Sequence, residues 1–318
     1  MTAATLAQAE RGITAKVNYS AADVVAVFLS QLDAMPQTIT AYKYNLRPFV
    51  SWLEREGIAI DAVKAADILE YKRYLMETHK PSTVNAYVTS VRKLFSWLES
   101  MTGYTSPARA VKGVRGANKS HMSKAHDALS HSQARAIAQH EGDGVTGLRD
   151  RAMINLMLVC ALRTIEVTRL NVGNYRQMGT ARIIEITGKG HAEADTFKVV
   201  DERVARLLDS YLKTRGKVDA EDPLFASTSN RNKGGRMTTR AVNGIVKGVM
   251  QAEGIDSPRL SAHSLRHSAI TYAVESGATL LEAQTFARHE DPRTTEIYIH
   301  VAEALRGACE GYVASVLA

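Results

Sequence analysis

Apolar residues recur every three or four positions along most of the first hundred residues, which is the spacing of helices that bury one face. In the first such stretch the apolar stripe contains Val24, Val25, Phe28 and Leu32, and Ser20 can cap its start. Four stretches of this kind with short connections predict a compact helical bundle. They cover residues 20–32, from 38 or 40 to 53, 65–79 and 81–98.

The chain after residue 128 is predicted to be mostly helical, with one clear strand region. The segments ARIIEIT (181–187) and TFKVV (196–200) are rich in β-branched residues, and a Gly-Lys-Gly loop lies between them. Strands and helices do not alternate regularly, so a doubly wound parallel sheet is not expected. The predicted fold class is mainly α with a small antiparallel β-sheet: a four-helix N-terminal domain followed by an α+β domain. Helices of the second domain are expected at 130–140, 147–162, 202–215, 238–253, 263–276, 279–287 and from 292 onward.

Length and composition fit a globular protein of about two domains. The 318 residues are 45% apolar and 23% charged, and no stretch reaches the roughly 18 apolar residues that span a bilayer. The longest apolar stretch, 152–162, contains Asn155 and is predicted to be a buried core helix. No secretory signal is visible, so a cytoplasmic location is expected, with Cys160 and Cys309 as small core residues.

The charge balance permits a polyanionic partner without requiring one, at a net +7 and a pI near 9.3. Five basic residues and no acid lie between Thr105 and His126, together with Pro107, Gly113 and Gly116. This stretch is predicted to be a linker, either a solvated hinge or an arm that follows phosphates. The expected organisation is a tail (1–19), a helical domain (20–104), a basic linker (105–128) and a second domain with a C-terminal helix (129–318).

Several familiar sites are excluded by the sequence. The Gly-Lys-Gly loop is not a P-loop, because no GxxxxGK[ST] is present and no helix begins there. His263 and His267 stand four apart, as zinc ligands can, but Ser264 occupies the position where a zinc protease has glutamate. No third ligand is suggested nearby, so no metal site is expected.

What remains is a set of cationic and protic side chains near helix ends and in the loop. Taken singly, each has an ordinary explanation: Arg163 can pair with Glu166, Lys189 can be a solvated loop tip, and Tyr298 can be a half-buried tyrosine. Together, two arginines, a lysine, two histidines and a tyrosine could hold a phosphodiester anion and supply a nucleophile. The set is Arg163, Lys189, His263, Arg266, His289 and Tyr298.

Three segments that carry these residues resemble the tyrosine recombinases, the phage integrase family. ALRTIE (161–166) is similar to the first arginine box and HSLRH (263–267) to the HxLRH box. ARHEDPRTTEIYIH (287–300) resembles the closing segment, in which a histidine precedes the nucleophilic tyrosine by nine positions. Lys189 sits where the family keeps its catalytic lysine. Ala161 and Arg288 depart from the family, which commonly has glycine at both positions, and Arg288 adds a positive charge.

The resemblance runs from about Ser20 to the C-terminus and implies a site-specific DNA recombinase. Such an enzyme cleaves and rejoins DNA through a 3′-phosphotyrosyl link, in integration and excision or in replicon dimer resolution. The link keeps the bond energy, so no nucleotide cofactor and no metal are expected. The implied roles are Tyr298 as nucleophile, His263 as base, Arg163 and Arg266 on the non-bridging oxygens, Lys189 as acid, His289 as a phosphate donor and Glu166 as an orienting partner of Arg163 or His263.

The partners implied are double-stranded DNA with inverted half-sites and a homo-tetramer on two sites, or a hetero-tetramer with a related recombinase; no membrane partner is expected. An apolar stripe from Val301 to Val316 predicts a terminal helix that packs in its own domain or on a neighbouring subunit. DNA contacts are expected from Lys43, Arg47, Arg92, Lys93, Arg109, Lys112, Arg115, Lys119, Arg236 and Arg240.

Other classes remain as alternatives. A DNA-binding protein could keep this fold without catalysis, and a type IB topoisomerase shares the chemistry, although the helical N-terminal domain argues against the latter. About 19 residues precede that domain, so an added arm-binding domain is not expected. The chain is then closer to Xer-type resolvases or small mobile-element integrases, and the sequence does not choose between them.

Overall fold

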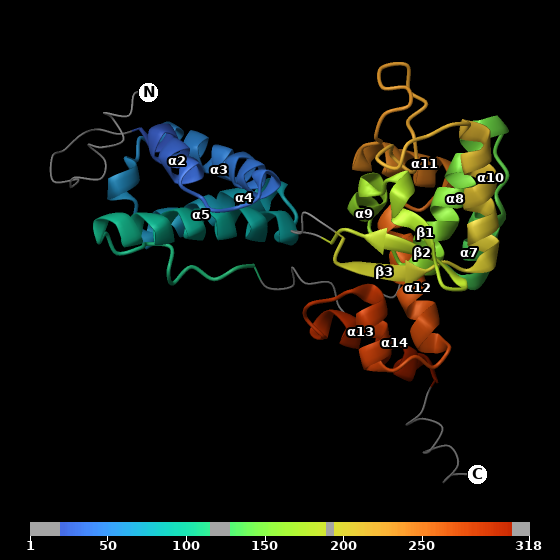
Figure 1. The fold of residues 1–318 in the computed structure, drawn as a ribbon. Helices are drawn as coiled ribbons and strands as arrows, with labels where there is room; N and C mark the ends of the chain where they lie inside the picture. Colours follow the sequence, from blue (N-terminus) through green and yellow to red (C-terminus); the bar gives the residue numbers. More distant parts are fainter. Residues whose placement is uncertain (1–19, 115–127, 189–193, 307–318) are drawn as a thin grey trace, which may run out of the picture. The chain divides into compact units, whose positions relative to one another are not determined.

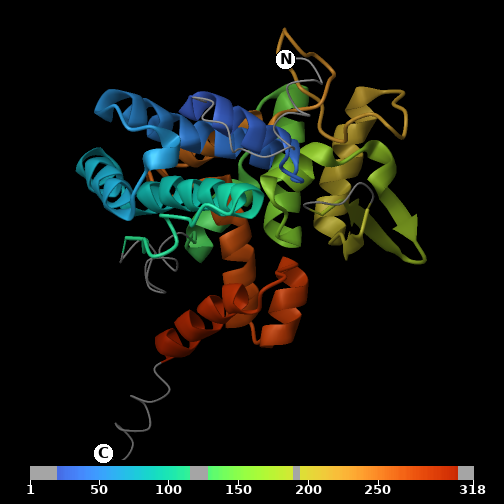
Figure 2. The same ribbon diagram turned by 90° about the vertical axis from the view of Figure 1, so that its left-hand side faces the viewer.

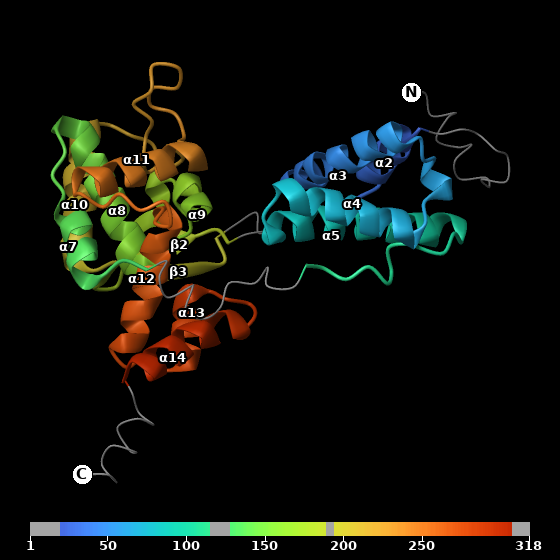
Figure 3. The same cartoon turned by 180° about the vertical axis from the view of Figure 1, so that it is seen from behind.

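The computed structural model describes residues 20–114, 128–188 and 194–306. Contacts divide the chain into two compact units, residues 1–119 and 120–318, which are shown in Figures 1 to 3. Both units are built mainly of helices, and the second also contains one antiparallel sheet. The predicted fold class is therefore confirmed.

The described part of the first unit contains four α-helices around an aromatic core. Phe49 lies at its centre, with ring centroids 5.0 Å from Tyr71 and 6.0 Å from Phe95 in edge-on contacts. Prolines begin two of the helices and left-handed glycines follow the same two, which fixes their ends. The predicted bundle is thus confirmed. The helices are α2 (Ala21–Ser30), α3 (Pro36–Glu56), α4 (Ala65–Thr78) and α5 (Pro81–Thr102).

The first part of the predicted linker packs onto this bundle. Ala108 and Val111 are buried in its core. The amide of Asn85 accepts a hydrogen bond from the Val114 N–H (2.6 Å) and donates one to the Val114 carbonyl (3.2 Å). The described residues up to 114 therefore belong to the first unit, whereas Arg115 and Lys119 lie outside the described residues.

The second unit is organised around α8 (Gly144–Cys160), which is buried along most of its length. This confirms the core helix predicted at 152–162, and Cys160 lies within it, while Cys309 lies outside the described residues. α8 contacts α7, α9, α10, α11 and α12, and α12 also contacts α13 and α14. No helix among the described residues is long and apolar enough to cross a membrane. The surrounding helices are α7 (His131–Gln139), α9 (Thr164–Arg169), α10 (Glu202–Arg215), α11 (Thr239–Ala252), α12 (Ala262–Glu275), α13 (Leu280–Ala287) and α14 (Arg293–Arg306).

The sheet has the strand order β1-β2-β3, and both pairs are antiparallel. It is anchored on α10, where the Tyr175 hydroxyl donates to the Ala205 carbonyl (3.3 Å). At the far end of the β2–β3 hairpin, the Gly188 N–H donates to the Asp195 carboxylate (2.7 Å), which closes the stem directly before Lys189. The strands are β1 (Tyr175–Met178), β2 (Ala181–Ile186) and β3 (Thr196–Val199), of which β1 was not predicted.

Candidate active site

Side chains from α12 and α14, together with Arg163 just before α9 and the turn after α13, line one cavity of about 690 Å³. Five of the six residues in the predicted catalytic set lie on its wall. Lys189 is outside the described residues, but Gly188 and Asp195, which close the hairpin stem beside it, also line the cavity. The lining residues are Arg163, Gly188, Asp195, His263, Arg266, His267, Arg288, His289, Glu290, Asp291, Thr294 and Tyr298.

Arg163 is held at the start of α9 by a buried carboxylate. Glu166, whose side chain is 0% exposed, accepts from the Arg163 backbone N–H (2.7 Å) and from Arg163 Nη1 (2.8 Å). The same carboxylate accepts from Arg288 Nη2 at 2.5 Å. A buried carboxylate that holds a guanidinium in this way fixes its direction. Glu166 is therefore positioned to orient Arg163.

Arg266 lies on α12 and is 2% exposed. Its Nη1 donates to the Ala161 carbonyl (2.5 Å), and its Nη2 donates to the Ala287 carbonyl. Burial, followed by the nearby charge of Arg163, lowers the pKa of Arg266 to about 10, so the group stays protonated at neutral pH. His263, Arg266 and His267 share one face of this helix because they are three or four residues apart.

The turn that ends α13 is held by three cations. Lys198 Nζ donates to the Phe286 carbonyl (2.8 Å), Arg266 to the Ala287 carbonyl, and Arg163 Nη2 to the Arg288 carbonyl (3.1 Å). These carbonyls lie at or beyond the C-terminal end of the helix, the negative end of its dipole. Because His289 follows this turn directly, the same contacts place its ring.

Two residues at the site adopt left-handed backbone conformations that glycine normally occupies. Ala161 has φ 50° and Arg288 has φ 53°, and among the described residues no other non-glycine has positive φ. Such a conformation costs an L-residue roughly 1–2 kcal/mol. These are the two positions at which the sequence departs from the glycines of the resembling family. The turn geometry is therefore retained although the glycines are absent.

Tyr298 lies on α14 and is packed against two small clusters that contain Ala269, Ala287 and Ala283. Its hydroxyl is hydrogen-bonded to Nδ1 of His267. Burial raises the pKa of Tyr298 to about 12, while the charge of Arg266 acts in the opposite direction. The hydroxyl is therefore protonated at neutral pH and needs a proton acceptor before it can attack.

The histidine at this hydroxyl is His267, for which the sequence suggested only the role of a metal ligand. The assignment of His263 as the base stays a prediction; its ring centroid lies 4.5 Å from that of His267. A signal was present in the sequence, because the HxLRH box places its second histidine one helical turn after the first. Within the described residues no group of three or more His, Cys, Asp or Glu could hold a metal ion.

His289 is a neutral hydrogen-bonding group. Burial and the charges of Arg266 and Arg163 lower its pKa to about 4. Its Nδ1 lies 2.8 Å from Oγ1 of Thr295, which is fully buried. When the Thr295 hydroxyl donates to Nδ1, the ring proton is on Nε2, the tautomer that can donate to a phosphate oxygen.

The predicted DNA-contact residues differ in how they are engaged. Arg109 pairs with Glu99 at 2.9 Å. Arg236 donates to the Thr168 carbonyl (2.8 Å) and to Asn171 Oδ1 (2.5 Å), so it also ties α9 to the loop before α11. Contact with DNA stays a prediction for the whole set. Lys43, Arg47, Lys93, Lys112 and Arg240 are exposed, and Arg92 is partly buried.

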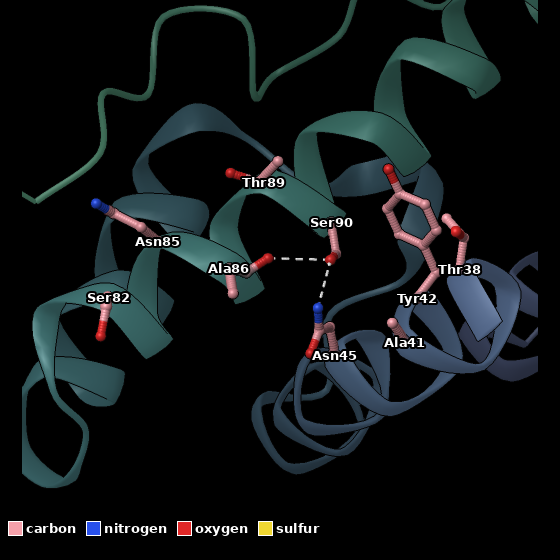
Figure 4. A pocket seen from close by; sticks show the side chains of 9 residues that line it. All are labelled: Thr38, Ala41, Tyr42, Asn45, Ser82, Asn85, Ala86, Thr89 and Ser90. Atoms are coloured by element: carbon pink, nitrogen blue, oxygen red, sulfur yellow. Dashed lines mark hydrogen bonds between the residues drawn. The ribbon is translucent and has the colours of Figure 1, made fainter. Parts of the chain in front are cut away.

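The first unit carries a groove of about 420 Å³ between α3 and α5. Figure 4 shows Asn45 and Ser90 facing one another, and the Asn45 amide donates to the Ser90 hydroxyl at 3.1 Å. The lining side chains are small or polar and include no acid. They are Thr38, Ala41, Tyr42, Asn45, Ser82, Asn85, Ala86, Thr89 and Ser90.

Each of the two units matches a known family model. Residues 127–304 match the model of the phage integrase family, and residues 28–102 match the phage integrase N-terminal SAM-like domain. The chain belongs to the phage integrase family. It is accordingly a tyrosine recombinase, an enzyme of site-specific DNA recombination.

Relatives agree with this family, and solved structures agree with its fold. The chain is 32% identical over 278 residues to the tyrosine recombinase XerD of Ralstonia nicotianae, covering 85% of each chain. It is 28% identical over 288 residues to XerD of Xanthomonas axonopodis, covering 86% of this chain and 90% of the relative. Its fold matches XerH bound to a palindromic difH substrate, with TM-score 0.74 and 19% identity over 91% of this chain and 83% of that one. It also matches a lambda integrase dimer bound to a core site, with TM-score 0.67 and 11% identity over 94% and 81%.

Proposed function

We propose that Tyr298 attacks the scissile phosphodiester and breaks the bond from phosphorus to the 5′ oxygen. The tyrosine oxygen forms a 3′-phosphotyrosyl bond while its proton passes to a histidine, and the 5′ oxygen leaves as a hydroxyl. Attack by a 5′-hydroxyl of another strand reverses these steps and exchanges the strands. The observation that carries the proposal is the convergence of Tyr298, Arg163, Arg266 and His289 on one cavity.

Charge stabilisation falls to the arginines and His289. Negative charge builds on the two non-bridging oxygens, and fixed guanidinium donors stabilise such charge most when they need no reorientation. Glu166 holds Arg163, and two main-chain carbonyls hold Arg266, so both are fixed before substrate binds. The neutral imidazole of His289 adds a donor without adding charge.

The proton transfers are assigned to two places. The hydroxyl of Tyr298 is hydrogen-bonded to His267, so this histidine is the first acceptor, and His263 lies one turn away on the same helix as its partner or alternative. Lys189 protonates the leaving 5′ oxygen, in keeping with a hairpin stem that borders the cavity.

The groove between α3 and α5 is the proposed DNA-reading surface of the first unit. Ser82, Asn85, Ala86 and Thr89 follow one face of α5, and Lys93 continues that face one turn later. Hydroxyl and amide side chains pair with base edges, while lysine pairs with phosphate. Lys43 and Arg47 are four residues apart on α3 but are offset from the groove face by helical periodicity.

The substrate and assembly follow from the same proposal. The chain would bind double-stranded DNA with inverted half-sites and act as a homo-tetramer on two sites, or as a hetero-tetramer with a related recombinase. Both structures cited above contain DNA-bound recombinases, which supports DNA as the partner. A cytoplasmic location is expected because the substrate is DNA.

Covalent trapping tests the proposal. The target site is first selected from random duplexes, and nicked suicide substrates are then built on it. Wild type should form a covalent protein–DNA adduct that survives excess EDTA. Tyr298→Phe should bind the site without forming an adduct, because only the attacking oxygen is lost. Tyr175→Phe, which alters a tyrosine on the sheet, is the control and should still form the adduct.

The outcomes separate the alternatives. Binding without any adduct from wild type would favour a DNA-binding protein without catalysis. Relaxation of supercoiled DNA without a paired specific site would favour a topoisomerase. An adduct formed by Tyr298→Phe would show that another residue is the nucleophile.

The reading surface has its own test. Lys93→Gln should weaken binding and reduce the slope of log affinity against log salt by about one unit, because one phosphate contact is lost. Lys64→Gln, at an exposed lysine outside the predicted DNA-contact set, is the matched comparison and should leave that slope unchanged. An equal loss from both variants would show that the slope reports net charge and not a phosphate contact of Lys93.

A further inference from the structure

Arg288 brings a third guanidinium to the cavity, at the position before His289. Its side chain is 13% exposed, and Nη2 donates to the buried Glu166 carboxylate at 2.5 Å. Its Nε and Nη1 are buried without a hydrogen-bond partner in the described part of the structure. Buried N–H groups of an ionised side chain are costly to leave unpaired, so such donors indicate a missing acceptor.

In Arg163 and Arg266, both terminal guanidinium nitrogens already donate to acceptors within the protein. Both terminal nitrogens of Arg266 donate to main-chain carbonyls, and those of Arg163 donate to Glu166 and to the Arg288 carbonyl. Arg163 and Arg288 thus share the buried carboxylate of Glu166, while the two contacts of Arg266 are to main-chain carbonyls. An anion with several oxygen acceptors would satisfy the two unpaired donors of Arg288.

The backbone indicates that the side chain matters. Position 288 is in the left-handed region at φ 53°, where glycine would be unstrained. The turn itself is closed by main-chain hydrogen bonds from the N–H of Arg288 to the Thr285 carbonyl and from the N–H of His289 to the Gln284 carbonyl. Glycine could make both bonds, so the turn alone gives no reason for arginine here.

We propose that Arg288 is a third phosphate-binding arginine, which offers Nε and Nη1 to a non-bridging oxygen of the scissile phosphodiester. Its bond to Glu166 holds the guanidinium at the cavity wall, and the same carboxylate holds Arg163, so the two cations are set by one anchor. The inference rests on the proposed attack by Tyr298. Arg288 would then stabilise the charge that develops on phosphorus-bound oxygens during that attack.

The test compares Arg288→Gly with wild type on two suicide substrates, one with an ordinary scissile phosphodiester and one with a methylphosphonate there. The glycine variant relaxes the backbone and should be folded and bind DNA as wild type does. Its adduct formation on the phosphodiester should fall by about 10²-fold, the usual effect of losing one fixed donor to developing charge. A methylphosphonate carries no charged non-bridging oxygen, so the deficit should shrink markedly on that substrate.

Matched variants guard the interpretation. Arg293→Ala removes an arginine whose side chain is 86% exposed and should leave both rates unchanged. Arg288→Lys keeps the charge but loses the fork, and should fall between glycine and wild type. An equal deficit on both substrates, or no deficit, would overturn the proposal, the first outcome showing that Arg288 acts only by positioning Glu166. Failure of wild type to form any adduct would instead count against the attack by Tyr298.

Discussion

Replacing His267 by asparagine should slow adduct formation at neutral pH by about 10²- to 10⁴-fold, the range that a positioned general base supplies. Asparagine places an amide oxygen near the position of the imidazole Nδ1, so the hydrogen bond from the Tyr298 hydroxyl can persist. The amide cannot accept the proton. The variant therefore separates holding the hydroxyl from deprotonating it.

The size of the effect follows from the buried hydroxyl. Its pKa is raised to about 12, so at pH 7 only about one molecule in 10⁵ carries the tyrosinate without help from a base. In the asparagine variant, whose reaction depends on the tyrosinate fraction, the rate of adduct formation should rise about tenfold for each pH unit, because this fraction grows by that factor below the pKa. Between pH 7 and pH 9 the variant should gain about 100-fold, whereas wild type, with its base in place, should gain less.

The assay is single-turnover adduct formation on nicked suicide substrates across this pH range, with binding measured separately. His263→Asn is the matched variant on the same face of α12. If His267→Asn kept the wild-type rate and pH profile while His263→Asn showed the loss and the steep profile, the base would be His263, and the hydrogen bond to His267 would be only a resting contact.

Three further outcomes are expected. Lys189→Ala should slow cleavage with little change in DNA affinity. A substrate with a bridging 5′-sulfur, which leaves without protonation, should restore the cleavage rate of this variant but not that of Arg266→Ala. Equal rescue of both variants would refute the assignment of Lys189 as the acid. Glu166→Gln should lower the free energy of unfolding in denaturant titrations by about 3 kcal/mol, because it breaks a buried ion pair, whereas the exposed Glu202→Gln should change it by less than about 1 kcal/mol. Truncation after His300 should leave binding to a single DNA site intact but weaken cooperative binding of two protomers and recombination. A wild-type recombination rate, or an unfolded product, would favour packing of the terminal helix within its own domain.

The helical elements and most of the site were predictable because their signals are local. Apolar residues at three-to-four spacing indicated the bundle, and a continuous apolar stretch indicated α8. The convergence of His263, Arg266 and Tyr298 was implied by the resemblance of their segments to the tyrosine recombinases. Strand β1 was missed because only Tyr175 of its four residues is buried, so no alternation is visible. The start of the linker was predicted to lie outside the core, although Ala108 and Val111 pack into it. The prediction missed this because the two residues stand among basic and polar residues and form no apolar pattern.

The rest of the site depends on contacts between residues that are distant in sequence. Arg288 bonds Glu166 across 122 residues, and Lys198 reaches the Phe286 carbonyl across 88. No spacing rule links such pairs. Nor does the sequence show that the backbone of Arg288 is in the left-handed region, because that conformation is set by the turn in which the residue lies. A role for His267 beside Tyr298 could be predicted from the sequence, because the HxLRH segment places it one helical turn after His263.

The turn that ends α13 has a consequence for how cleavage activity arises during folding. Its three carbonyls are held by side chains that lie 88, 21 and 125 residues away along the chain. Contacts over such separations form late, because the loops between them must close first. A partly folded molecule therefore has the tyrosine without the assembled cations, and the capacity to break a DNA strand arises only together with the geometry that can reseal it.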